Sequence, residues 1–214
     1  MADYFLVLDR TTFEGQLRPP LAEAWRRRSF SPCRHLARAW SAAALDFARR
    51  YRVNPDDLLL PRLDGLAFDR SLWRGAVGEL FQVAALEAPE VPAHLDSLAH
   101  LLAGHPPAGP AGPRDTPPFQ QALHGSRDLT FGLATYRPGH AGYNDAGDVA
   151  RLAAWFASAR PDAWTPADLA GLPGLDEPDR DEELAFAREW FTVLADLYAR
   201  AARAGHVIAL ESAS

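Results

Sequence analysis

The sequence predicts an α+β fold, with a small sheet that includes the N- and C-terminal strands and is covered by several amphipathic helices. Two observations carry this prediction. Short apolar runs rich in strand-forming residues lie near both ends of the chain, at residues 4–8 and 206–210. Between them, apolar residues recur at spacings of three and four over several stretches, which is the period of helices with one buried face.

The clearest helix start in the first part of the chain is Ser31 followed by Pro32. A hydroxyl side chain can cap free backbone N–H groups, and proline fits the first helical position. This helix is predicted to run to about Arg52. Its apolar stripe consists of Leu36, Trp40, Ala43, Ala44, Phe47 and Tyr51. Before it, we expect a linking stretch up to Pro20 and a short helix over residues 21–28.

The strongest amphipathic pattern is a final helix expected over residues 181–204. Acidic residues fill its first turn, where the helix dipole favours negative charge, and Gly205 is a typical helix end. Because the connection at Gly205 is very short, we expect strand 206–210 to fold back and join the same sheet as strand 4–8, covered by the aromatic residues of the helix. Further helices are predicted over residues 72–86, 91–103, 119–124 and 165–170, and after a cap at Asn144 or Asp145.

Length and composition are those of one folded unit. The chain has 214 residues, of which 48% are hydrophobic and 10% aromatic, so it can bury a core without disulfides or metals. We therefore expect a single α+β domain over residues 1–214. The proline- and glycine-rich stretch 104–118 is predicted to be a surface loop of this domain, since it cannot form regular structure.

The charged residues exclude several kinds of chemistry. All 22 basic residues are arginine, so a Schiff-base lysine, a phosphate-loop lysine and a lysine general base are excluded. The net charge of -6 argues against nucleic-acid binding, because phosphates repel an acidic protein. Residues 1–74 nevertheless carry 13 arginines against 9 acids, and residues 75–214 carry 9 against 19. Within the Arg-rich segment 19–69, the cluster of Arg26, Arg27, Arg28, Arg34 and Arg38 is either a solvated helix face or a contact for an acidic partner.

The single cysteine and the first residues predict the compartment. With only Cys33, no disulfide can form within the chain, as is typical of a reducing compartment. The first nine residues lack a positively charged segment, and their apolar run is too short for a signal peptide or a membrane span. The expectation is a cytoplasmic protein without membrane contact.

No catalytic or metal-binding motif stands out, and no cofactor is expected. His94, His100 and His105 are spaced by six and five residues, so no two of them share a helix face as metal ligands usually do. Scattered polar residues near the middle loops are the candidates for ligand binding. They are Asp96, His100, His124, Arg127, Tyr136 and His140. The loop that holds the last two is rich in Tyr, Arg and His, which are common at contact surfaces.

The pattern of the C-terminal half resembles a known family. The order is Phe119 to Gly125, then the helix around Val149, and then the acidic aromatic helix followed by strand 206–210. Together with the first strand, this order resembles the YfbM-like family of uncharacterised bacterial proteins, mainly over residues 90–211. The resemblance implies the α+β fold and a bacterial source, and no reaction, because the family has no established one. The chain departs from the family in segment 19–69 and at Leu95 and Asp96, where a Trp-His pair often stands.

Two hypotheses of function follow. The first is a non-enzymatic protein-interaction module or subunit, since catalytic motifs are absent, the charge is asymmetric and the aromatic content is high. The second is a small-molecule-binding protein or hydrolase whose site is assembled from scattered His, Arg and Asp residues, because such sites are often invisible in one sequence. The first is favoured, and so the protein is not expected to be an enzyme.

Overall fold

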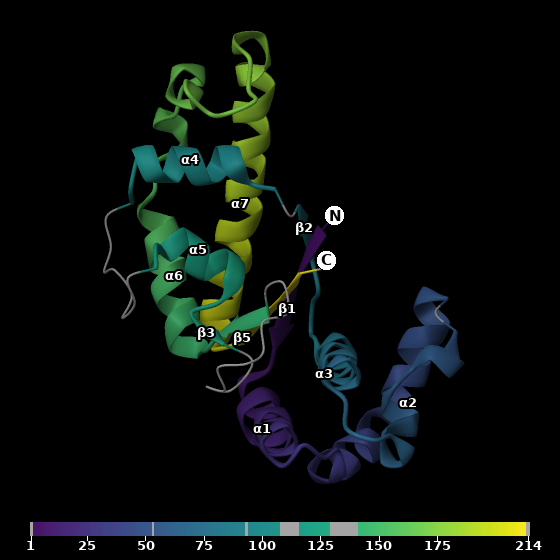
Figure 1. Ribbon diagram of the computed structural model, residues 1–214. Helices are drawn as coiled ribbons and strands as arrows, with labels where there is room; N and C mark the ends of the chain where they lie inside the picture. The colour runs from purple at the N-terminus through teal and green to yellow at the C-terminus, as the bar shows by residue number, and fades with distance from the viewer. Residues whose placement is uncertain (1, 53, 93, 108–115, 129–140, 213–214) are drawn as a thin grey trace.

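A five-stranded antiparallel sheet lies at the centre of the computed structural model, which describes residues 2–52, 54–92, 94–107, 116–128 and 141–212 (Figure 1). The strands lie in the order β2-β1-β5-β4-β3, so the first and last strands along the chain are neighbours near the middle of the sheet. Their bounds are β1 Ala2–Leu8, β2 Glu90–Pro92, β3 Arg127–Asp128, β4 Ala141–Asn144 and β5 Val207–Ser212.

Helices make up most of the rest and pack on both faces of this sheet. The α-helices are α1 Arg18–Arg27, α2 Arg34–Tyr51, α3 Arg70–Ala84, α4 Asp96–Gly104, α5 Pro118–His124, α6 Ala146–Ser158 and α7 Arg180–Ala204. Shorter helical turns are η1 Thr12–Leu17, η2 Ser31–Cys33, η3 Pro55–Asp57, η4 Leu60–Gly65, η5 Pro161–Ala163, η6 Pro166–Leu169 and η7 Glu177–Asp179. The chain is therefore an α+β protein, as its sequence predicts. No helix in the described ranges is both long and apolar enough to cross a bilayer.

Alternation along the central strands divides the core in two. Leu6 and Leu8 of β1 point into one hydrophobic cluster together with α1, α2 and α3, whereas Phe5 and Val7 point into a second cluster with α4 to α7. Successive strand residues face opposite sides of a sheet, so β1 serves both clusters with a continuous apolar run. We call the two sides of the sheet the α1–α3 face and the α4–α7 face.

The predicted C-terminal arrangement is confirmed. The 25-residue helix α7 ends at Gly205, whose φ of 68° is the left-handed conformation that ends many helices. Strand β5 then pairs antiparallel with β1 from Val207↔Leu8 to Ser212↔Asp3. Phe191 and Tyr198 of α7 lie in the cluster on the α4–α7 face and cover the sheet as expected.

Three predicted elements need correction. The linking stretch after the first strand is in fact helical, because η1 continues directly into α1, and the proline pair is accommodated within the first turn of α1. Val91 belongs to strand β2 rather than to a helix, which begins only at Asp96. Within the predicted loop 104–118, Gly104 ends α4 and Pro118 begins α5, and residues 108–115 lie outside the described residues.

Candidate functional site

The predicted ligand-binding residues do not form one site. Asp96 and His100 lie on α4, whereas His124 ends α5 and Arg127 begins β3. No hydrogen bond or ion pair joins Asp96 or His100 to Arg127 within the described part of the chain. Tyr136 and His140, the last two candidates, lie outside the described residues, so they stay a prediction. The described residues also contain no group of three or more acidic, His or Cys side chains placed to hold a metal ion.

Arg127 is the candidate with the most definite surroundings. Its guanidinium contacts Asp145 at 2.6 Å through Nη2 and Asp148 at 2.7 Å through Nε. Burial opposes the charge of Arg127, but the hydrogen bond that Arg127 donates to Asp148 and the charges of both carboxylates outweigh burial and raise the pKa of Arg127. Asp145 also caps α6 by accepting the N–H of Asp148 at 2.9 Å. Arg127 thus ties β3 to the start of α6.

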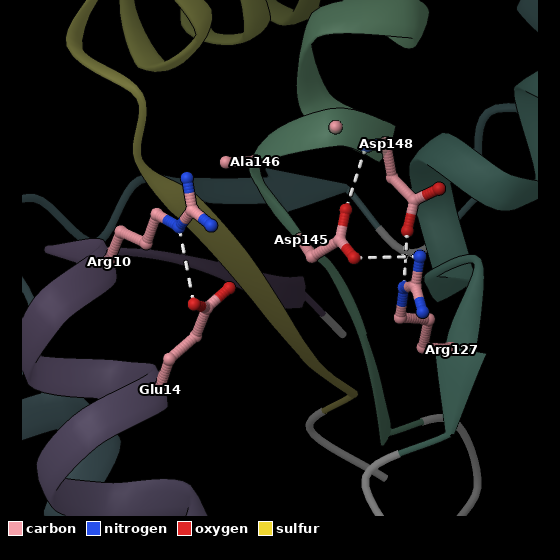
Figure 2. A pocket seen from close by; sticks show the side chains of 7 residues that line it. Arg10, Glu14, Arg127, Asp145, Ala146 and Asp148 are labelled. Atoms are coloured by element: carbon pink, nitrogen blue, oxygen red, sulfur yellow. Dashed lines mark hydrogen bonds and ion pairs between the residues drawn. The ribbon is translucent and has the colours of Figure 1, made fainter.

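A small polar pocket of about 390 Å³ lies beside Arg127, between the start of η1 and the start of α6 (Figure 2). Arg10, just before η1, and Glu14 of η1 line one side of the pocket and form an ion pair at 3.2 Å. Arg127, Asp145 and Asp148 line the other side. Each guanidinium already faces a carboxylate, so the charges of the pocket are largely neutralised from within the chain.

Directly behind the pocket, a buried polar network joins three elements. The Asn144 side chain accepts hydrogen bonds from the backbone N–H and the hydroxyl of Ser126, both at 2.7 Å, and donates to the carbonyl of Gln121 and to the hydroxyl of Tyr198. Tyr198 in turn donates to the carbonyl of Ala122 at 2.7 Å, and burial raises the pKa of Tyr198 and keeps its proton in place. The network therefore links α5, β4 and α7 and has a structural role.

Two glycines make the same region tight at the backbone level. A Cβ on Gly142 would lie 2.0 Å from the carbonyl oxygen of His124, and a Cβ on Gly125 would lie 2.5 Å from the backbone nitrogen of Tyr143. Gly125 also has a φ of 87°, which glycine adopts at little cost. Together with the buried network, these contacts show that the backbone beside Arg127 is closely packed.

A larger groove of about 630 Å³ lies on the other side of the molecule, on the α1–α3 face. It opens where α2, the end of α3 and strand β1 converge, and Figure 1 shows α3 placed between α2 and the sheet. We call it the α2–β1 groove. Its lining comes from β1 (Tyr4, Leu6), α2 (Ala43, Asp46, Phe47, Arg50), α3 (Gln82, Val83) and the segment after α3 (Ala85, Leu86, Glu87, Ala88, Glu90).

The α2–β1 groove exists because α2 packs away from the sheet. Leu36, Ala37, Ala44 and Ala48 are buried in the cluster on the α1–α3 face, and α2 contacts η4 and α3 through this side. Trp40, another residue of the predicted apolar stripe, is only partly buried. Ala43 and Phe47 are partly buried and line the groove. The helix therefore keeps a second apolar edge that is partly exposed.

Leu86 at the rim of the groove is the most exposed large hydrophobic side chain among the described residues, with 60% of its surface accessible. Its backbone is nevertheless fixed, since the N–H of Leu86 donates to the carbonyl of Val7 at 2.8 Å. An exposed leucine held on a firm backbone beside an apolar groove is typical of a protein contact surface.

The charges of the groove differ between its two sides. On the α2 side, Asp46 pairs with Arg49 at 2.8 Å and Arg50 stays without an ion-pair partner in the described ranges. On the side after α3, Glu87 pairs with Arg200 at 3.1 Å, and no described residue forms an ion pair with Glu90. One side thus offers a free cation and the other a free anion.

Comparison with known proteins adds little to this geometry. A crystal structure of YfbM from Escherichia coli, described as a protein of unknown function, is similar to this chain with a TM-score of 0.47 and 14% sequence identity, over 99% of each chain. No protein-family model matches the sequence, and neither does any curated protein. This similarity is too weak to show a family or to locate a site.

The groove residues are missing from the predicted site, and one signal could have pointed to them. Phe47 and Ala43 belong to an apolar stripe that is wider than the side of α2 that packs on α3 and η4. Leu86 follows the end of α3 as an apolar residue in a segment that contains two acids and a proline. The sequence gives no distance between α2 and the sheet, however, so the groove itself could not be predicted.

Proposed function

We propose that this protein is a protein-interaction module and that the α2–β1 groove binds an apolar segment of a partner protein. The observation that carries the proposal is the exposed Leu86 beside a groove whose α2 side includes Ala43 and Phe47. Monomeric proteins rarely leave apolar side chains gathered around a groove unless a partner covers them. The polar pocket at Arg127 supports a ligand less well, because its charges are already paired.

The energetics are those of a moderate interface. Burying a leucine side chain that is free in the unbound protein contributes about 1.5 kcal/mol or more. The residues that contribute most to an interface lie near its centre and lose their contact with water on binding. A partner that covers Leu86 and Phe47 should therefore lose roughly tenfold or more in affinity when Leu86 is shortened, since 1.4 kcal/mol corresponds to a factor of ten.

Site-specific photocrosslinking tests the proposal. A photoreactive amino acid replaces Ala88, an exposed residue of the groove, and in the control chain it replaces Ala185, an exposed residue of α7. Both chains are incubated with extract of the organism that produces the protein, and the captured proteins are identified and purified. We expect a protein that is captured from position 88 and not from position 185.

A matched pair of variants decides whether the groove is responsible. Leu86→Ser removes the exposed apolar side chain of the groove, and Val193→Ser removes the other large exposed one, which is 37% accessible and lies on α7. We expect the purified partner to bind the Leu86→Ser chain roughly tenfold more weakly and the Val193→Ser chain as well as the wild type. Equal affinity for all three chains would refute the proposal.

A further inference from the structure

The way in which the sheet edge is blocked limits what can occupy the α2–β1 groove. The N–H groups of Phe5 and Val7 in β1 donate to the carbonyls of Pro89 and Glu87, so the side of β1 nearest the groove is already paired. Pro92 leaves one position of the outer edge of β2 without an N–H donor, whereas the backbone of Pro89 faces β1. A partner strand would find only the three-residue β2 to pair with, so strand addition is disfavoured.

The α2 side of the groove has the spacing that fits a helix. Its four lining residues, Ala43, Asp46, Phe47 and Arg50, lie at positions i, i+3, i+4 and i+7 of one helix. This ridge spans about two helical turns, or roughly 10 Å. Helices pack by placing their own rows of side chains at these spacings against such ridges. A partner helix would lie beside α2 and over the exposed Leu86.

The unpaired charges specify the flanks of that helix. Arg50 on the α2 side and Glu90 on the opposite side form no ion pair with the described residues, and the groove between them is lined by both apolar and polar side chains. A helix seated in the groove would meet a cation on one flank and an anion on the other. Acidic residues on the flank beside Arg50 and basic residues on the flank beside Glu90 would form ion pairs with both side chains. These pairs would also fix the direction of the helix.

We infer that the groove recognises an amphipathic helix whose apolar face is bordered by acidic residues on one flank and basic residues on the other. This inference rests on the proposed function and adds the chemistry of the partner. The acidic flank faces Arg50 and the basic flank faces Glu87 and Glu90. Helix-in-groove recognition of this type reads apolar anchors at i, i+3 or i+4, and i+7.

Two designed peptides of identical composition test the inference on the full chain. Each has about 15 residues, long enough to form a helix, and the same leucine face. In the first, all glutamates lie on one flank and all arginines on the other. In the second, both charges are mixed on both flanks. We expect the first to bind roughly fivefold more tightly by fluorescence anisotropy, because net charge and apolar surface are equal and only the flank pattern differs.

Charge reversals on the protein identify the flanks. Arg50→Glu or Glu90→Arg alone should weaken the first peptide by roughly three- to fivefold. The double variant exchanges the charges on the two sides of the groove. A peptide helix that docks in the opposite direction exchanges its own two flanks, so it can pair with both charges again and its affinity should return. The control Glu189→Arg changes the net charge equally at an exposed position of α7 and should have no effect beyond a weak salt-dependent one.

The outcomes separate the inference from the proposed function. Equal affinity of the two peptides, or a double variant that stays as weak as the single ones, overturns the inference. If both peptides bind equally and lose affinity with Leu86→Ser, the groove still binds apolar segments and the proposed function stands. No binding of either peptide also overturns the inference, whereas the proposed function is decided separately by crosslinking from position 88.

Discussion

The two faces of the sheet are stabilised in different ways. On the α4–α7 face, buried polar side chains and close backbone contacts fix how the helices pack, whereas the core on the α1–α3 face consists almost entirely of apolar side chains. The buried polar residues of the described chain are Ser97, Gln121, Ser126, Asn144 and Asp148, and every one of them lies on the α4–α7 side. Hydrogen bonds and glycine contacts demand one geometry, but apolar side chains tolerate rearrangement. The adaptable face is also the one that keeps an open groove.

The sharpest test of this difference compares two glycines. Gly142→Ala places a Cβ 2.0 Å from the carbonyl oxygen of His124, a backbone atom that cannot move alone, and we expect it to lower the free energy of unfolding by at least about 3 kcal/mol. In Gly75→Ala on the α1–α3 face, the nearest atom is the flexible Leu59 Cδ1 at 2.6 Å, and alanine favours the helix. That change should stay within about 1 kcal/mol. Urea unfolding measures both, and equal losses would contradict the comparison.

The second prediction concerns the buried network. Asn144→Leu keeps the branched shape of the side chain and leaves the Ser126 N–H and the Gln121 carbonyl without their partner, so we expect a loss of about 2–3 kcal/mol. Tyr198→Phe removes one hydroxyl and should cost about 1–2 kcal/mol. Thermal and urea unfolding give the two values. A loss below about 0.5 kcal/mol for Asn144→Leu would show that the network does not hold this face.

Glu79 is the polar exception on the α1–α3 face and gives a prediction for pH. Its carboxylate accepts the N–H groups of Leu59 and Leu60 at 2.7 and 3.1 Å, and Glu79→Ala should cost about 1–2 kcal/mol. Burial raises the pKa of Glu79. The folded chain therefore binds this proton more tightly than the unfolded chain, and the contribution of Glu79 to stability is lost as pH rises through the raised pKa.

Glu79→Gln isolates that pH dependence, because glutamine keeps an acceptor and cannot ionise. Unfolding curves recorded between pH 4 and 8 should show the wild type losing more stability than the variant as pH rises. Parallel curves for the two chains would mean that the carboxyl is not buried in the way described.

The smallest expected effect is on the reactivity of Cys33. The thiol is buried in the cluster on the α1–α3 face, donates to the carbonyl of Pro20 at 3.4 Å, and burial raises its pKa to about 12. Since only the thiolate reacts, a thiol reagent at pH 8 should label the native chain very slowly. Labelling should accelerate with mild denaturant as this face opens. Rapid, complete labelling of the native protein would show that the α1–α3 face is not closed around Cys33.

Much of the fold could be predicted because its signals are local. The strands at 4–8 and 206–210, the end of the last helix at Gly205 and the cap at Asp145 each follow from a few neighbouring residues. The helical stretch before Pro20 was missed because tertiary burial of Phe13 and Leu17 overrides its weak helical signal. The expectation of a single domain stays a prediction.

The site could be predicted far less well. Arg127 was selected from the sequence, but its partners Asp145 and Asp148 reach it only through the pairing of β3 with β4. The groove depends on how far α2 stands from the sheet, which no local pattern encodes. The sequence feature that can indicate such a surface is an apolar stripe, as on α2, that is wider than the side of the helix that packs on its neighbours.

The position of β5 has a consequence for the timing of folding. It lies between β1 and β4, yet among the described elements it is the last to leave the ribosome. Pairing β5 with β1 closes a loop of almost the whole described chain, which is entropically costly and makes the central contact of the sheet highly non-local. Both hydrophobic clusters share these two strands, so neither can be completed during synthesis until β5 arrives. The nascent chain must therefore carry two unfinished cores at once, and chaperones have their longest opportunity to engage it in that interval.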